Sequence, residues 1–239
     1  KCASDYRNVI KTNIIGITGS CGKTTLKELL GNSLKKITKT YFSPKSFNNK
    51  FGVPLSLFNL KEDKKFGVFE LGMDKKGEIN FLSKILKPNL GIITNISYAH
   101  SKNFKNIKGI AEAKSEIIEN IKSGGSIILN NDDKFFKFLK SKALKRKLNV
   151  YSFSLKNKKS YASLEKIIEI KNKFKLFFKV GTKKEYFFSY NRSKNHIQNL
   201  LAALTVISLF FDLKNIPKNI FLDCKIPEGR GDIKRLKLN

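Results

Sequence analysis

The chain has 239 residues, of which 41% are hydrophobic and 28% charged, and its formal net charge is +29. This length and composition suit one large domain with a hydrophobic core, and they exclude a disordered or fibrous chain. The N-terminal residues do not have the pattern of a signal peptide, and the longest apolar run, 200–211, is too short to span a bilayer. We therefore expect a protein without a membrane span.

The three cysteines, Cys2, Cys21 and Cys224, are widely separated. Their number and spacing fit neither a disulfide framework nor a metal site, which indicates a reducing, cytoplasmic location.

The positive charge has two interpretations. A partner with a phosphate backbone or an anionic membrane would account for it. Alternatively, the excess follows from a genome rich in A and T, because Lys, Asn, Ile and Phe are all abundant and lysine is spread along the whole chain, whereas arginine is scarce. Proteins that bind nucleic acid usually rely on arginine. We favour compositional bias and expect no specific nucleic-acid partner.

Strand-like and helix-like patterns alternate from residue 13 to about 153. This alternation predicts an α/β fold, in which a doubly wound, mostly parallel sheet carries helices on both faces. The expected strands are 13–17, 66–70, 90–96, 126–130 and 149–153, and the expected helices are 24–37, 54–60, 77–86, 107–122 and 132–144.

The pattern changes after residue 160. Three strand-like stretches separated by polar turns predict a small antiparallel subsheet, and a helix follows them. These strands are 162–170, 174–180 and 185–190, and the helix is 194–211.

A glycine-rich loop joins the first strand to the first helix. It reads Gly19-Ser20-Cys21-Gly22-Lys23-Thr24-Thr25, which is typical of a phosphate-binding loop, or P-loop. In such a loop, Gly19 and Gly22 allow backbone amides to face phosphate oxygens, Lys23 reaches the β- and γ-phosphates, and the Thr24 hydroxyl binds Mg²⁺. The usual pattern has a glycine five residues before Gly22, where this chain has Ile17.

Three further side chains are candidates for chemistry. Glu70 ends the expected strand 66–70 and so points to a metal ligand in the crevice where such sheets bind ligands. His100 follows the expected strand 90–96, and it is either a metal ligand or a solvated loop residue. Lys114 lies on an expected helix, and its local pattern alone favours the solvated surface.

The order and spacing of several motifs resemble those of the Mur ligases, and within them the MurF type. The motifs include the loop described above, Glu70-Leu71-Gly72 and the stretch around Lys114. They also include Asn48-Asn49-Lys50-Phe51-Gly52-Val53-Pro54. The resemblance covers the central ATPase domain of that family.

The resemblance implies a role for each candidate residue. Thr24 and Glu70 would hold one Mg²⁺ and His100 a second, and Lys114 would be carbamylated by CO₂, so that it becomes an anionic ligand. Lys23, Lys114 and His100 would be the catalytic residues. ATP would bind the loop residues Gly19, Ser20, Cys21, Gly22, Lys23, Thr24 and Thr25, together with Asn199 at the adenine and Arg230 near the phosphates. Asn48 and Asn49 would contact substrate or nucleotide.

The chain departs from the family pattern at several positions. Asn195-His196 stands where the family has His-Asn, so the resemblance assigns no role to His196. Cys21 stands where Asn or Ser is commoner, and Ser101-Lys102 follows His100 where Leu-Glu is usual.

The resemblance also implies boundaries and an activity. Residues 13–226 would form the central ATP-binding domain, with an antiparallel insert at about 161–190, and 1–12 and 227–239 would be linkers to an N-terminal and a C-terminal domain. The activity would be an ADP-forming ligase of peptidoglycan precursor synthesis that joins D-Ala-D-Ala to UDP-MurNAc-tripeptide, in a monomeric protein. The alternatives are another ligase of the Mur superfamily, such as a folylpolyglutamate synthase, or a basic nucleic-acid-binding P-loop protein.

Overall fold

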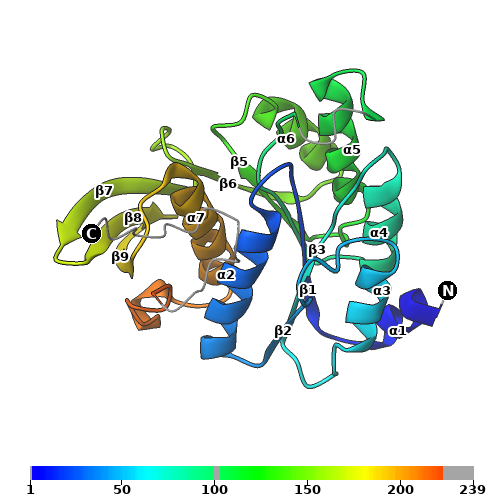
Figure 1. The fold of residues 1–239 in the computed structure, drawn as a ribbon, viewed down its shortest axis with the longest axis horizontal. Coiled ribbons are helices and arrows are strands. Elements are labelled where there is room, and N and C mark those ends of the chain that lie inside the picture. The colour runs from blue at the N-terminus through cyan, green and yellow to red at the C-terminus, as the bar shows by residue number, and fades with distance from the viewer. Residues whose placement is uncertain (1, 99–102, 223–239) are drawn as a thin grey trace, which may run out of the picture.

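The structure is a computed structural model, and it describes residues 2–98 and 103–222. Its centre is a nine-stranded sheet with the strand order β2-β3-β1-β4-β5-β6-β7-β8-β9 (Figure 1). The seven strands β1 to β7 run parallel to one another. Strands β8 and β9 continue the sheet in antiparallel fashion. The strands are β1 (Asn13–Thr18), β2 (Thr40–Phe42), β3 (Phe66–Glu70), β4 (Leu90–Ile93), β5 (Ser126–Asn130), β6 (Asn149–Ser154), β7 (Ala162–Ile170), β8 (Lys173–Val180) and β9 (Lys183–Ser189).

Helices cover the two faces of the sheet. One face carries α2 and α7, which pack against each other, and the opposite face carries the remaining α-helices (Figure 1). The helices are α1 (Cys2–Val9), α2 (Lys23–Ile37), α3 (Gly52–Phe58), α4 (Glu78–Leu86), α5 (Ile107–Glu119), α6 (Phe136–Lys145) and α7 (Lys194–Ser208), followed by the 3-10 helix η2 (Leu213–Asn215).

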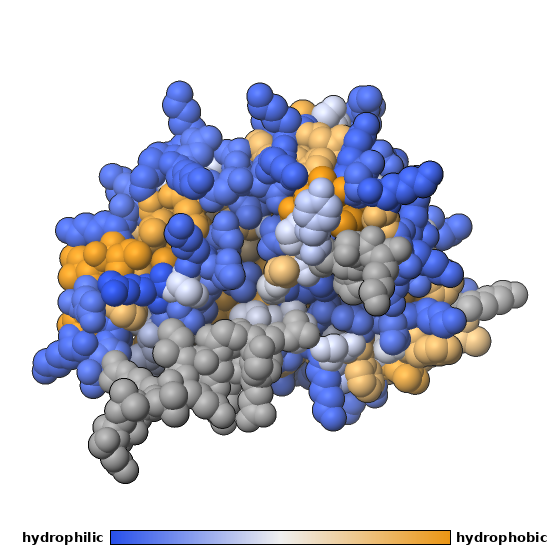
Figure 2. Space-filling view, turned by 45° about the horizontal axis from the view of Figure 1, so that its top comes forward, coloured by the Kyte–Doolittle hydropathy of each residue, from blue (hydrophilic) through white to orange (hydrophobic). Residues whose placement is uncertain are grey.

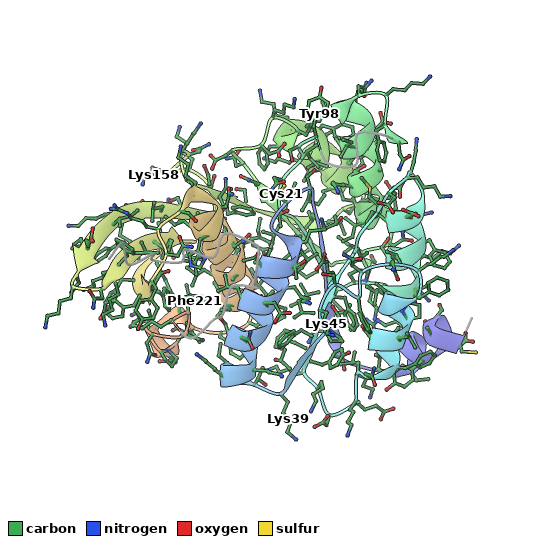
Figure 3. All side chains as sticks on the ribbon, in the orientation of Figure 1. Cys21, Lys39, Lys45, Tyr98, Lys158 and Phe221 are labelled. Atoms are coloured by element: carbon green, nitrogen blue, oxygen red, sulfur yellow. The ribbon has the colours of Figure 1, made fainter. Side chains whose placement is uncertain are left out.

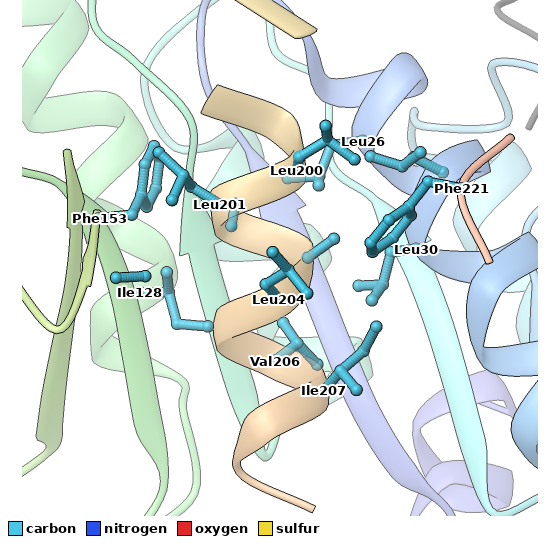
Figure 4. Close-up of a cluster of buried hydrophobic side chains, with 14 of the residues drawn as sticks. Leu26, Leu30, Ile128, Phe153, Leu200, Leu201, Leu204, Val206, Ile207 and Phe221 are labelled. Carbon is cyan, nitrogen blue, oxygen red and sulfur yellow. The ribbon is translucent and has the colours of Figure 1, made fainter. Parts of the chain in front are cut away.

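The sheet separates two hydrophobic cores, because successive side chains of a strand point to opposite faces. Ile15 and Ile17 of β1 point toward α2 and α7, whereas Ile14 joins the core on the other side. Successive strand side chains point to opposite faces, so a strand buried on both sides is apolar at nearly every position. Around α7, Leu200, Leu204 and the neighbouring side chains fill the first of these cores (Figure 4).

The fold class expected from the sequence is confirmed, with some local differences. Strand β4 ends at Ile93, three residues before the expected end, because the chain there turns to hold the glycine-rich loop. The expected antiparallel strands are present as β7, β8 and β9, and they continue the main sheet because β7 pairs in parallel with β6 at Phe153 and Ser154.

Three described elements, η2 among them, have no counterpart among the expected ones. Strand β2 has only three residues. Helix α1 lies within residues 1–12, which we assigned to a linker, and its Arg7 is buried and donates to the carbonyls of Leu86, Lys87 and Ile10. Residues 2–9 are therefore tied to α4 by hydrogen bonds, and the domain boundaries themselves stay a prediction.

The topology places one end of the sheet in position to bind a ligand. After β1 the chain builds β2 and β3 on one side of it, and then crosses to β4 on the other side. The crevice above such a switch point, at the carboxyl ends of the strands, is where open α/β sheets bind ligands. Among the described residues, no helix is long and apolar enough to cross a membrane.

Candidate functional site

The glycine-rich loop joins β1 to α2 and lies at the switch point of the sheet. Gly22 lies just before α2 with φ 82°, and Gly19 has φ 143°. A Cβ on Gly19 would lie 2.0 Å from Thr94 Oγ1, so only glycine fits there. No side chain caps the first turn of α2. The N-terminus of a helix is positive and attracts anions.

Residues that follow β4 hold this loop in place. The Asn95 side chain binds Cys21 at two points: its amide donates to the Cys21 carbonyl at 3.1 Å, and its oxygen accepts from the Cys21 N–H at 3.0 Å. Thr94 Oγ1 donates to the same carbonyl at 2.6 Å, and Ser20 exchanges two 2.9 Å hydrogen bonds with the backbone of Ser97. The loop conformation is thus fixed by contacts from a neighbouring strand end, and Cys21 lies at the top of α2 (Figure 3).

Lys23 folds over the loop. Its ammonium donates to the Gly19 carbonyl at 2.9 Å and to the Ser20 carbonyl at 3.2 Å. A phosphate group above the loop would lie within reach of this flexible cation and of the helix N-terminus together.

Two buried oxygen groups meet beside the loop. Thr24 Oγ1 donates to Glu70 Oε2 at 2.7 Å, and the Asn48 amide donates to Glu70 Oε1 at 2.8 Å. Thr24 is 4% exposed and Glu70 is 1% exposed. A hydroxyl and a carboxylate at the edge of a phosphate site are the hard oxygen ligands that Mg²⁺ prefers, with phosphate oxygens and water completing its shell. The described residues hold no group of three or more His, Cys, Asp or Glu suited to a metal.

A buried lysine of α2 supports the loop that carries Asn48. Lys27 is fully buried on α2, forms an ion pair with Glu28 at 3.0 Å, and donates to the backbone carbonyl of Lys45. Asn49 caps α3, because its side-chain oxygen accepts from the N–H groups of Phe51 and Gly52. Asn48 therefore reaches Glu70 from a segment that is anchored on both sides.

Lys114 is a buried cation next to another cation. It lies on α5 with 1% exposure, and burial together with the nearby Lys23 ammonium lowers the pKa of Lys114 to about 7. A substantial fraction of this side chain is thus a neutral amine near neutral pH, and a neutral amine is a nucleophile. The loop and α5 bring Lys23 and Lys114 together although the two residues are far apart in the sequence.

A cavity of about 480 Å³ opens between the loop and the start of α7. Its walls include Thr25, Asn199 and His196, and Asn199 lies so close to the loop that a Cβ on Gly22 would be 3.2 Å from its Oδ1. The His196 ring is 7% exposed; its Nε2 lies 3.0 Å from Ser189 Oγ, and its Nδ1 has no partner among the described residues. Burial lowers the pKa of His196 to about 4, so the ring is neutral at pH 7.

A second cavity, of about 680 Å³, lies on the other side of Lys23. Asn48, Asn49 and the segments 50–51 and 72–78 line it, together with Phe81 and Leu82 of α4. The lining includes Lys50, Lys75 and Lys76, and aromatic rings at Phe51 and Phe81. Asp74 and Glu78 also line it, so four lysines, Lys23 included, face two carboxylates and the cavity has a net positive lining with apolar rings.

The structure brings most of the candidate residues together. The cavity of about 480 Å³ is lined by Asn199 and by the loop residues Ser20, Cys21, Gly22, Lys23 and Thr25. Glu70 is joined to the loop by its hydrogen bond with Thr24, and Lys114 lies close to Lys23. His100 and Arg230 lie outside the described residues. Sequence reasoning missed Thr94, Asn95 and Lys27. Asn95 has no spacing that marks it as a loop clamp, and Lys27 is one lysine among many.

The fold and this loop define an α/β domain of the P-loop class. The chain matches the Mur ligase middle domain over residues 17–207, and it belongs to the Mur ligase family.

Similar proteins and solved structures narrow the assignment within this family. UDP-N-acetylmuramoyl-tripeptide–D-alanyl-D-alanine ligase of Buchnera aphidicola from Baizongia pistaciae is 35% identical over 92% of this chain and 46% of that protein. The crystal structure of MurF from Acinetobacter baumannii has a TM-score of 0.89 at 27% identity, covering 99% of this chain and 51% of that one. The structure of MurF ligase from Thermotoga maritima in complex with ADP has a TM-score of 0.86 at 24% identity, over 98% of this chain and 53% of that one. The chain thus spans about half the length of these proteins, as a MurF-type central domain.

Proposed function

We propose that this chain is the ATP-binding part of a ligase that joins D-Ala-D-Ala to UDP-MurNAc-tripeptide and releases ADP and phosphate. The observation that carries the proposal is the glycine-rich loop at the start of α2, with Thr24 hydrogen-bonded to Glu70 and with Lys114 close to Lys23. The similarity to MurF ligases supplies the two substrates.

In this proposal the nucleotide occupies the cavity of about 480 Å³, with its base near Asn199 and its phosphates on the loop. Thr24 and Glu70 would hold one Mg²⁺, which would supply positive charge for the β- and γ-phosphates. The resemblance alone assigns a second Mg²⁺ to His100 and a phosphate contact to Arg230. Lys23 is the cation that stabilises the transferring phosphoryl group.

The acceptor carboxylate occupies the second cavity, next to Lys23. Transfer of the γ-phosphoryl group to this carboxylate forms an acyl phosphate and releases ADP. The amine of D-Ala-D-Ala then attacks the acyl carbon, and the tetrahedral intermediate expels inorganic phosphate. The lysines at the second cavity favour an acceptor that carries phosphate and carboxylate groups.

Lys114 reacts with CO₂ to form a carbamate. The neutral amine attacks the carbon of CO₂ and loses one proton, so the residue becomes an anion. Its buried position and the pKa of about 7 support this step, because an unreactive ammonium dominates at an ordinary lysine of pKa near 10.5. The carbamate would balance the positive charge of Lys23 and help to position the second metal ion.

Nucleotide binding tests the loop assignment. Lys23→Ala removes the cation that reaches the phosphates, and it should weaken Mg²⁺-ATP binding by about 1.5–3 kcal/mol, the range for a charge-assisted hydrogen bond. Isothermal calorimetry measures the effect, and Lys35→Ala is a matched control because it removes an exposed lysine from the last turn of the same helix. Equal affinity of the Lys23→Ala variant and the wild type would refute the phosphate-loop assignment.

Carbamylation is testable by ¹³C NMR with ¹³C-bicarbonate. We expect a carbamate resonance in the wild type at pH 8 that weakens toward pH 6, because protonation removes the nucleophilic amine. The resonance should be absent in Lys114→Ala and unchanged in Lys142→Ala, a partly buried lysine on α6. A spectrum of Lys114→Ala that retains the resonance would rule out Lys114 as the site.

The ligase reaction itself requires the full-length translation product. ADP release should depend on UDP-MurNAc-tripeptide and D-Ala-D-Ala together, and a folate substrate with glutamate should not replace them. Turnover with the folate substrate would instead favour the folylpolyglutamate synthase alternative.

A further inference from the structure

Positive charge is concentrated on one helix far from the nucleotide cavity. Residues 134–147, which contain α6, include seven cations and no acidic residue: Lys134, Lys137, Lys140, Lys142, Lys145, Arg146 and Lys147. Leu139 and Ala143 point inward and are buried in the core. The outward stripe consists of Lys137, Lys140, Ser141, Leu144 and Lys145, and it borders a shallow hollow of about 490 Å³.

The charges of this stripe are not balanced by neighbouring acids. Lys142 donates to Ser115 Oγ, and Arg146 lies 3.7 Å from Glu119. No carboxylate lies within ion-pair distance of Lys137, Lys140 or Lys145 in the described part of the chain. The β7–β9 end of the sheet also carries many lysines, but there Lys158 pairs with Glu165 and Lys183 pairs with Asp212.

An apolar side chain lies within the basic stripe. Leu144 is 54% exposed, and Lys140 and Lys145 flank it. The headgroup layer of a bilayer can accept both kinds of side chain, because lysine stems lie along the interface with their ammonium groups among the phosphates while leucine reaches the acyl boundary. Clusters of four to eight basic residues on an amphipathic helix are typical of binding to anionic lipids.

The same stripe is less suited to nucleic acid. Single-stranded nucleic acid needs aromatic rings that can stack with bases. The rings near α6 are partly buried, and lysine ammonium groups cover Phe135, Phe136 and Phe138 at 5.3–6.0 Å. Only one of the seven cations is arginine, the residue that binds phosphate diesters in pairs of hydrogen bonds.

We propose that the outward face of α6 is a docking surface for an anionic phospholipid bilayer. The contact is chiefly electrostatic and reversible, with Leu144 as its apolar anchor. It leaves the nucleotide cavity free, because that cavity opens between the glycine-rich loop and α7 (Figure 1).

Vesicle sedimentation tests the proposal on the 239-residue chain. The wild type should bind vesicles that contain about 30% phosphatidylglycerol at low salt, and it should not bind pure phosphatidylcholine. Binding should fall at least tenfold when salt rises to about 0.5 M, because the screening length then falls below 5 Å.

Charge reversal separates this face from the net charge. The triple variant Lys137→Glu, Lys140→Glu, Lys145→Glu should bind phosphatidylglycerol vesicles at least tenfold more weakly than the wild type. The control Lys166→Glu, Lys171→Glu, Lys184→Glu makes the same change in net charge on the exposed β7–β9 end, and its binding should stay within threefold. Leu144→Ser, which leaves the charge unchanged, should lower binding severalfold.

Three results would overturn the proposal: no binding by the wild type, equal losses in both triple variants, or a short oligonucleotide bound more tightly than the vesicles through the same α6 lysines. All changes are on outward side chains, and circular dichroism establishes that each variant is folded before its binding is compared.

Discussion

His196 combines a bonded and an unbonded nitrogen in the wall of the nucleotide cavity. Ser189 Oγ donates to the Asn191 carbonyl and accepts from the Asn191 N–H, so its hydroxyl proton is already used. Ser189 must therefore accept from Nε2–H of His196, which leaves Nδ1 as an unprotonated acceptor. Protonation of this ring would place a positive charge at a buried nitrogen without a partner.

The stability of the protein should therefore depend on His196 in acid. The pKa of His196 is about 4 in the folded protein and 6.5 in an unfolded chain, so the unfolded state binds the proton first as the pH falls. The stabilisation is complete above pH 6.5 and is lost as the pH falls from 6.5 to 4, by about 3 kcal/mol at about 1.4 kcal/mol per pKa unit. Urea unfolding at several pH values measures this loss, which His196→Asn should not show. Parallel pH profiles for the two proteins would contradict the prediction.

At the scale of elements, α5 and α7, which carry Lys114 and Asn199, begin with different caps. The Asn106 side chain accepts from the Gly109 N–H at 3.0 Å at the start of α5, and Ser193 accepts from the His196 N–H at 3.4 Å at the start of α7. The shorter hydrogen bond should contribute more to stability, since hydrogen bonds weaken toward the limit of their distance range.

Asn106→Ala should lower the free energy of unfolding by about 1 kcal/mol, the usual cost of losing an N-terminal cap. Ser193→Ala should cost less, because its hydrogen bond is longer. Chemical denaturation with urea compares the two variants directly, and a larger loss in Ser193→Ala would contradict this order.

Long elements with a clear period could be predicted from the sequence. Phe66–Glu70 and Ser126–Asn130 form strands with the expected bounds, because each has an apolar centre that is buried between helices and ends at a polar residue. Strand β2 is too short to have a period, and the end of β4 depends on Asn95, which leaves the sheet to hold Cys21. That contact joins two segments far apart in the chain, and no local pattern encodes it.

Some residues of the candidate site could likewise be predicted from the sequence, and others could not. Lys23 and Thr24 belong to a local motif, and Glu70 follows from its position at a strand end. The burial of Lys114 depends on how α5 packs, so its sequence pattern alone pointed to the surface and only the resemblance singled it out. Lys27 was missed for the same reason, since its partner is a backbone carbonyl of another segment.

At the scale of the whole molecule, positive charges dominate the surface. Figure 2 shows long hydrophilic side chains over most of the visible face, with apolar patches mainly at its edges. With 48 basic and 19 acidic residues, the folded protein holds many like charges close together, which destabilises the compact state.

Salt should therefore stabilise this protein. Raising the ionic strength from about 10 mM to about 150 mM shortens the screening length from about 30 Å to about 8 Å, so repulsion between distant lysines is removed. We expect the thermal midpoint to rise by several degrees in sodium chloride, as followed by circular dichroism. Sucrose, which carries no charge, serves as the control for general cosolvent effects, and a midpoint that falls with salt would contradict the prediction.

Lys23 is a wall of both cavities, since its side chain borders the hollow beside α7 and the one beside α4. A ligand that draws its ammonium away from the Gly19 and Ser20 carbonyls changes the shape and the charge of the other cavity as well. Thermodynamic linkage then requires that whatever one occupant does to the affinity for the second, the second does equally to the affinity for the first. One side chain thus couples the two binding equilibria.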